Sequence, residues 1–169
     1  MALMTPVDRL EDHVTVLFER HYAALVRLAA VLVDDVGSCE ELVQDAFAKL
    51  LTTRPGPALG KEAPYLRSMV LNGARSRLRR RQVQQRNVAV GPSAHPAAEL
   101  EAVHRLETRR VLDALRSLPG RQAAVLALRF QADLTEVEIA ETLGISTGTV
   151  KTHASRGIAN LRDRLGDTS

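Results

Sequence analysis

Residues 134–161 read LTEVEIAETLGISTGTVKTHASRGIANL, a stretch whose spacing predicts two helices joined by a tight turn. Thr135 and Glu138 are spaced as a capping box, in which a hydroxyl and a carboxylate satisfy two unpaired N–H groups at the start of a helix. Gly144 can adopt the positive φ that ends this helix, and Ile145 can fill the turn. We therefore expect a short first helix that ends at a left-handed glycine.

The second helix of the pair has an inner stripe of apolar residues spaced three or four apart. Ser146 or Thr147 can cap its start. The stripe consists of Val150, Ala154, Ile158, Leu161 and Leu165. Two short helices in this arrangement are typical of a helix-turn-helix.

The outward face of the second helix carries hydrogen-bond donors, and no carboxylate occurs between Thr142 and Arg162. The outward residues are Thr149, Lys151, Thr152, His153, Ser155 and Arg156. Such donors suit DNA phosphates and base edges, so the face predicts DNA recognition. The alternative is a solvated amphipathic helix in an ordinary helical bundle.

The composition favours small helical bundles. Apolar residues make up 45% of the 169 residues, but aromatics only 3%, and tryptophan is absent. Cys39 is the one cysteine, which excludes an internal disulfide and suits a reducing compartment. The N-terminus has no signal-peptide pattern, and no apolar run approaches membrane-spanning length. We expect a cytoplasmic protein with no membrane insertion.

Positive charge is concentrated in the middle of the chain. Residues 63–98 contain seven arginines and no acidic residue, whereas residues 1–62 carry ten acidic and six basic side chains. A basic segment of this kind predicts a polyanionic partner. Arginine outnumbers lysine twenty to three, a bias that a GC-rich genome would also produce.

Helical periodicity divides the chain into two domains. Residues 1–86 contain a helix at about 10–33, a second opened by a Ser38–Glu41 capping box, and a third with Pro64 in its first turn. Residues 87–99 lack an apolar stripe and are predicted to be a linker. Residues 100–169 form the second domain, with helices at about 100–116 and 119–131 before the helix-turn-helix. We predict an all-α protein of two small helical domains, with a flexible linker and few contacts between them.

Segments of both domains resemble bacterial RNA polymerase sigma factors. ELVQDAFAKLL at 41–51 and APYLRSMVLNGARSRLRRR at 63–81 resemble sigma region 2, and ALRSLPGRQAAVLALRF at 114–130, with the helix-turn-helix, resembles region 4. Region 2, a short linker and region 4, with nothing between, is the order of extracytoplasmic-function (group IV) sigma factors. The arginine-rich stretches look similar to the actinobacterial SigE-like subgroup.

The resemblance implies three binding surfaces. Residues 1–86 would dock on the clamp helices of the largest subunit of core RNA polymerase, through Glu41, Gln44, Asp45 and Lys49. The same domain would bind the minus-10 element through Tyr65, Arg67, Asn72, Arg75, Arg79 and Arg80, with Arg77 and Arg81 extending this basic patch. Residues 100–169 would bind the minus-35 element through Thr149, Lys151, Thr152, Ser155 and Arg156. The alternatives are solvated faces on these helices and, for Tyr65, core packing at a helix start.

The implied function is that of an alternative sigma factor, which binds core RNA polymerase and promoter DNA and directs transcription initiation. Relatives are often held inactive by an anti-sigma factor, which makes such a protein a further expected partner. The alternative is a helix-turn-helix regulator of the response-regulator output type, acting without polymerase docking. No cofactor, metal site or catalytic residue is expected, because the five histidines and single cysteine lack metal-ligand spacing and no nucleotide-binding or nucleophile motif occurs.

Overall fold

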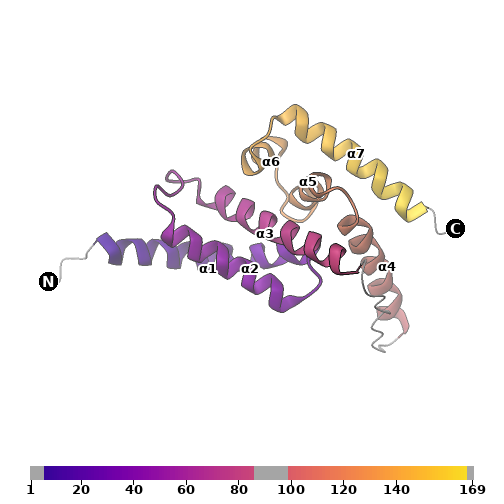
Figure 1. Cartoon of the computed structure of the whole chain (residues 1–169), viewed down its shortest axis with the longest axis horizontal. Coiled ribbons are helices and arrows are strands. Elements are labelled where there is room, and N and C mark those ends of the chain that lie inside the picture. Colours follow the sequence, from indigo (N-terminus) through magenta and orange to yellow (C-terminus); the bar gives the residue numbers. More distant parts are fainter. Residues whose placement is uncertain (1–5, 86–98, 167–169) are drawn as a thin grey trace.

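The computed structural model describes residues 6–85 and 99–166, and within them the chain forms helices and loops but no strand. The helices are α1 (Pro6–Leu32), α2 (Val36–Thr52), α3 (Glu62–Gln85), α4 (Glu99–Arg116), α5 (Gly120–Phe130), α6 (Glu136–Leu143) and α7 (Thr147–Gly166). The all-α prediction is confirmed (Figure 1). The predicted linker at 87–99 lies outside the described residues, except for Glu99 at the start of α4.

Helices α1, α2 and α3 pack on one another around an aliphatic core. The side chains of Leu28, Val43, Leu66 and Val70 are 1% exposed or less. Gly73 allows α2 and α3 to approach closely, because a Cβ at this position would lie 2.5 Å from a methyl carbon of Leu42. This core fixes the outward faces of α2 and α3, which are the faces of functional interest.

Helix α2 begins earlier in the chain than predicted. Asp35 is the N-cap, and its carboxylate accepts a hydrogen bond from the backbone N–H of Ser38 at 2.8 Å. The predicted Ser38–Glu41 capping box is therefore wrong, because Ser38 already lies in the first turn. An ionised carboxylate accepts this bond more strongly than a hydroxyl does, which favours the earlier start.

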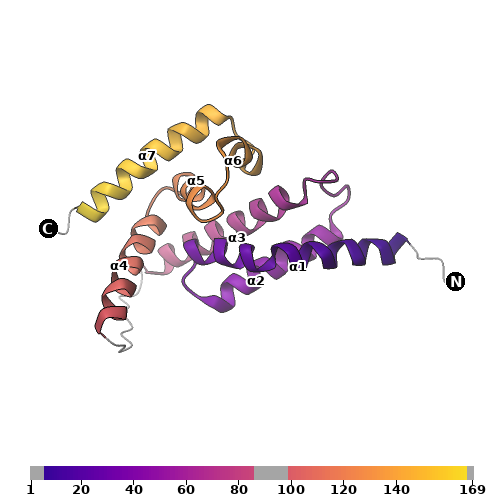
Figure 2. The same ribbon diagram turned by 180° about the vertical axis from the view of Figure 1, so that it is seen from behind.

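The second domain is built around α5. Its six consecutive residues from Ala123 to Leu128 are all buried, because α1 of the first domain packs against it together with α4, α6 and α7. Gly157 permits α7 to cross α5 closely, since a Cβ there would lie 3.1 Å from Cδ1 of Leu126. In both views α7 lies on the outer side of this domain, with α5 and α6 between it and α3 (Figure 1 and Figure 2).

The two domains contact each other, and the prediction of few contacts between them is wrong. Helix α6 packs beside α3, and α4 and α5 pack against α1. Leu115 and Leu118 of the second domain are buried, at 7% and 4% exposed. Polar bonds reinforce these contacts and are described below.

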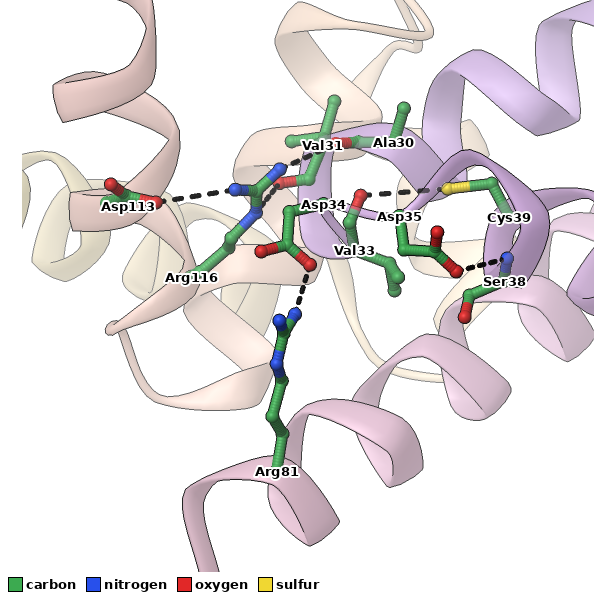
Figure 3. A network of polar contacts seen from close by, with 10 residues as sticks. All are labelled: Ala30, Val31, Val33, Asp34, Asp35, Ser38, Cys39, Arg81, Asp113 and Arg116. Carbon is green, nitrogen blue, oxygen red and sulfur yellow. Dashed lines mark hydrogen bonds and ion pairs between the residues drawn. The ribbon is translucent and has the colours of Figure 1, made fainter. Parts of the chain in front are cut away.

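Arg116 makes the most extensive polar contact between the domains (Figure 3). Its guanidinium donates to the carbonyl oxygens of Ala30 at 2.9 Å and Val31 at 3.2 Å, and to a carboxylate oxygen of Asp113 at 3.4 Å. The last carbonyls of a helix have no partner within it, and α1 has no basic residue in its own last turn. An arginine of the second domain thus caps the first helix of the first domain.

Candidate nucleic-acid interface

The helix-turn-helix has the predicted local geometry. The Thr135 hydroxyl accepts from the N–H of Glu138 at 3.3 Å, and the Glu138 carboxylate accepts from the N–H of Thr135 at 2.8 Å. Backbone and hydroxyl hydrogen bonds from Thr135 hold the pKa of Glu138 below its usual range. Gly144 ends α6 in the left-handed conformation, with φ of 64°. The capping box and the left-handed glycine are confirmed.

Helix α7 is capped by Ser146, whose hydroxyl oxygen accepts from the N–H of Thr149 at 3.1 Å. The first four members of the inner stripe pack as expected, with Val150 and Ala154 buried and Ile158 and Leu161 partly buried against the core, whereas Leu165 is half-buried and lies outside this core. This packing leaves the opposite face of α7 in solvent, where a DNA groove could reach it.

The predicted minus-35 residues differ in how free their side chains are. Thr149 and Thr152 bond locally, Thr149 to the Ser146 hydroxyl at 2.8 Å and Thr152 to the carbonyl of Gly148 at 3.1 Å. The ammonium of Lys151 lies 3.7 Å from the Glu136 carboxylate. Two further residues, Ser155 and Arg156, are exposed. Among the residues whose side chains the structure describes, these two make no hydrogen bond or ion pair, so they are the freest donors on this face.

The arginines of α3 divide between two faces. Arg77 pairs with Glu41 of α2 at 2.8 Å, and Arg81 pairs with Asp34. These two therefore stabilise the first domain and do not extend the basic patch. Arg67, Arg75 and Arg79 lie on another side of α3 and face the second domain, where they line two cavities between the domains.

Arg75 is held against the second domain. A Cβ at Gly120 would lie 2.7 Å from its Nε, so the start of α5 rests on the guanidinium. Burial, together with the nearby charges of Arg121 and Arg79, lowers the pKa of Arg75. Because the positive charges of Arg75, Arg79 and Arg121 repel one another, an anion bound beside them would be stabilised.

The other predicted minus-10 residues lie at the surface of the first domain. Asn72, Arg79 and Arg80 are exposed, and Arg67 is half-buried. Tyr65 is partly buried against the core, and its hydroxyl lies 3.1 Å from the hydroxyl of Thr53. This contact ties the start of α3 to the loop after α2.

The predicted docking face of α2 is open. Glu41, Gln44, Asp45 and Lys49 are all exposed, whereas the opposite side of the helix is buried. Cys39 on the buried side has its thiol donating to the carbonyl of Val33 at 3.6 Å. Burial raises the pKa of this thiol, which keeps it protonated.

Sequence reasoning missed the residues that join the domains. Lys61, before α3, pairs with Glu141 of α6, and Arg116 bonds only backbone carbonyls of α1 across the boundary. Within the described side chains, no cluster of three histidine, cysteine or acidic residues could hold a metal ion. No helix in the described ranges is long and apolar enough to cross a membrane.

Comparison with known families matches both domains. The Sigma-70 region 2 model matches residues 17–83, and the Sigma-70 region 4 model matches residues 114–163. The first match covers all of α2 and most of α1 and α3, which leaves no room there for a response-regulator receiver domain. Regions 2 and 4 in this order define the class: a sigma subunit of RNA polymerase.

Named relatives narrow this class. The RNA polymerase sigma-E factor of Streptomyces antibioticus is 30% identical over 143 residues, which cover 84% of this chain and 78% of that protein. The ECF RNA polymerase sigma factor SigM of Mycobacterium tuberculosis is 32% identical over 162 residues, covering 89% of this chain and 76% of that protein. The chain belongs to the extracytoplasmic-function sigma factors, non-enzymatic proteins that direct transcription initiation by RNA polymerase.

Two solved structures have the same fold. The sigma factor RpoE of Bartonella quintana, in complex with the anti-sigma factor NepR, matches with a TM-score of 0.63 and 21% identity over 92% of this chain and 98% of that chain. CnrH, in complex with the cytosolic domain of CnrY, matches with a TM-score of 0.65 and 23% identity over 94% and 91%. At these identities the likeness establishes the fold alone.

Proposed function

We propose that the two domains divide promoter recognition between them. Residues 1–86 dock on core polymerase and hold the minus-10 element, and residues 100–169 read the minus-35 element. The observation that carries this division is the outward face of α7, where Ser155 and Arg156 are exposed and unpaired among the described side chains. Side chains free of intramolecular bonds can donate to base edges without first breaking a contact.

Helix α7 is proposed to lie in the major groove. Arg156 is the proposed base reader, because a guanidinium can donate two bonds to one guanine. Lys151, Thr149, Thr152 and Ser155 are proposed to contact phosphates or bases beside it. The ammonium of Lys151 already lies beside the carboxylate of Glu136, and a DNA phosphate could replace this carboxylate as its anionic partner. This supports a phosphate contact for Lys151.

Helix α3 is proposed to hold the separated minus-10 strand. Arg67, Arg75, Arg79 and Arg80 are assigned to its phosphates, and Asn72 and Tyr65 to its bases. The partial burial of Tyr65 leaves only part of its ring available for stacking. The α2 residues Glu41, Gln44, Asp45 and Lys49 are proposed to bind the clamp helices of the largest polymerase subunit.

Two further assignments rest on the family. We place the protein in the cytoplasm, where the polymerase that it joins transcribes. An anti-sigma factor is a proposed partner, because the RpoE structure named above is a complex with one and CnrH is likewise bound to a partner protein. Pull-down from the native cell, followed by identification of the co-purifying proteins, tests that partner.

The experiment that separates the two DNA roles compares arginine variants in the polymerase holoenzyme. Arg156→Ala is expected to weaken binding by about 1–3 kcal/mol and to relax preference at one minus-35 position. Replacing Arg79 and Arg80 is expected to weaken binding to all promoters alike. The slope of the logarithm of the binding constant against the logarithm of the salt concentration is expected to decrease by about one for each phosphate that is no longer neutralised. Arg110→Ala, an equally charged change at an exposed position of α4, is the control. Equal losses on cognate and scrambled minus-35 sequences would remove Arg156 from the base readers.

A further inference from the structure

A cavity of about 210 Å³ lies where α1, α3 and the loop after α5 meet. Its basic lining residues are His21 and Arg27 of α1 and Arg67 of α3, and the side-chain amide of Gln131 adds a further donor. None of the lining residues in the described part of the chain is acidic. The cavity therefore gathers three groups that can carry positive charge without a lining carboxylate to neutralise them.

Apolar residues of the core form another part of the cavity wall. The side chains of Leu25, Leu28 and Leu66 line it and are 4% exposed or less. They keep water away on the core side, so charges in the cavity interact more strongly with one another than they would in bulk water. An anion placed among the basic residues would therefore be stabilised more than at a fully exposed basic patch.

The charges around His21 show the same excess of positive over negative groups. Burial and then the charge of Arg67 lower the pKa of His21, whereas the charge of Glu62 acts in the opposite direction. Glu62 does not line the cavity, and its Oε1 lies 3.2 Å from Nε2 of His13. The charge of Arg67 also acts on Glu138, which likewise lies outside the cavity lining. These carboxylates leave the cavity itself cationic.

We propose that this cavity binds one small tetrahedral oxyanion of the phosphate type. The guanidiniums of Arg27 and Arg67 can each donate two parallel hydrogen bonds to phosphate oxygens, and His21 and Gln131 can each donate one more. A phosphate monoester carries a charge of about −1.5 to −2 near pH 7, which the two guanidiniums can balance. His21 and Arg27 belong to none of the binding surfaces described above, so the proposal does not depend on the division of promoter recognition.

The size and access of the cavity suit a single phosphate group. Its volume of about 210 Å³ admits one such group but not the successive phosphates of a nucleic-acid strand. Arg27 and Gln131 are exposed, so an anion can reach the half-buried His21 and Arg67 from solvent. The group could be inorganic phosphate or the phosphoryl end of a nucleotide whose nucleoside stays outside the cavity. Titrations with inorganic phosphate and with adenosine monophosphate distinguish these two sources.

The test titrates the full chain with each anion at constant ionic strength, and chloride is the comparison anion. Nuclear magnetic resonance of carbon-13-labelled histidine rings reports binding, and His21→Gln identifies the signal of His21. Arg27→Gln removes one of the two guanidiniums. Arg9→Gln is the matched control, because Arg9 is exposed on the same helix about five turns away. Circular dichroism checks that each variant is folded.

Phosphate is expected to move the His21 signal in a saturable manner, and Arg27→Gln is expected to weaken this binding about two- to fivefold relative to Arg9→Gln, the range for one exposed charge pair. Tighter binding of adenosine monophosphate than of phosphate would support the site and assign it to a nucleotide, and weaker binding would assign it to inorganic phosphate. An equal response of His21 to chloride and to phosphate would overturn the proposal. Equal affinities of the Arg27→Gln and Arg9→Gln chains for both phosphate compounds would also overturn it.

Discussion

Replacing Arg116 with alanine is expected to open the chain without unfolding either domain. The guanidinium is the only part of this residue that bonds α1, through the carbonyls of Ala30 and Val31. Its remaining bond, to Asp113, lies within α4. The change therefore removes two bonds between the domains and one local bond.

The magnitude follows from the contacts. A hydrogen bond from a charged group contributes about 1.5–3 kcal/mol when its partner is left buried and unsatisfied. The Arg116 side chain is 14% exposed, but the freed carbonyls at the end of α1 can bond water, so each of the two bonds to α1 falls below this range, at about 0.5–1 kcal/mol. We expect a total loss of about 1–2 kcal/mol, which lowers the closing equilibrium constant by roughly 5- to 30-fold.

Energy transfer between dyes at Leu59→Cys and Ala159→Cys measures this equilibrium in single molecules. Cys39 can remain, because it is 1% exposed and out of reach of the labelling reagent. Arg110→Ala is the matched control, since Arg110 is exposed on the same helix and makes no hydrogen bond or ion pair among the described side chains. If Arg116→Ala and Arg110→Ala gave the same distance distribution as the unmodified chain, the capping role of Arg116 would be refuted.

Three further predictions concern stability. Leu128→Ala should lower the free energy of unfolding by about 2–5 kcal/mol in urea titrations, because Leu128 is fully buried. The control Val137→Ala, at a 68% exposed position, should have little effect, and similar losses for both variants would contradict the described core. Burial acts to raise the pKa of Glu62, but backbone hydrogen bonds and His13 outweigh it and hold the pKa below the usual 4.5. The ionised carboxylate therefore stabilises the fold above about pH 4.5, and this stabilisation is lost as the pH falls through the folded pKa. Glu62→Gln should then cost most near neutral pH and least near pH 3. A pH-independent difference would count against stabilisation of the ionised carboxylate by these bonds, which include a contact of 3.2 Å between Oε1 of Glu62 and Nε2 of His13. Fragments 1–86 and 100–169 should each be helical by circular dichroism, and an unfolded fragment would show that the domains depend on each other.

Much of the second domain was predictable because its determinants are local. The Thr135–Glu138 capping box and the left-handed Gly144 depend on residues within a few turns of each other, so spacing alone located them. The Ser38–Glu41 box has the same spacing but failed, because Asp35 caps the helix one turn earlier. Local patterns predict a helix start only when no stronger acceptor precedes them.

The spacing of the α3 arginines along the helix could also have predicted that they divide between two faces. Residues two apart in a helix do not share a face, so Arg77 and Arg81 could not extend a patch made by Arg75 and Arg79. Their partners, Glu41 and Asp34, lie 36 and 47 residues away in the sequence, and spacing within α3 does not identify them. The prediction that Arg77 and Arg81 extend the basic patch took residues 63–98 as one surface and so overlooked this division into two faces.

The contacts between the domains could not be predicted from the sequence. Arg116 bonds backbone carbonyls, which every residue possesses, so no pattern of side chains marks its partners. Lys61 and Glu141 are eighty residues apart and form an exposed pair of a kind that many charged residues could make. Such contacts depend on the assembled fold.

The most direct test of the central claim is transcription initiation with core polymerase and a variant of the α2 face. Gln44→Arg with Asp45→Arg reverses the exposed docking face and leaves the buried side of α2 intact. The control, Asp12→Arg with Thr15→Arg, makes the same charge change on exposed positions of α1. Core polymerase from the native cell is supplied with each folded protein and with promoter DNA enriched by the unmodified holoenzyme.

The account predicts that the unmodified chain and the α1 control support initiation, and that the α2 variant neither binds core polymerase nor initiates. The free chain alone should bind the same duplex weakly, with strong salt sensitivity and little sequence preference. Normal initiation by the α2 variant, or tight binding of one duplex site by the free chain, would contradict the account.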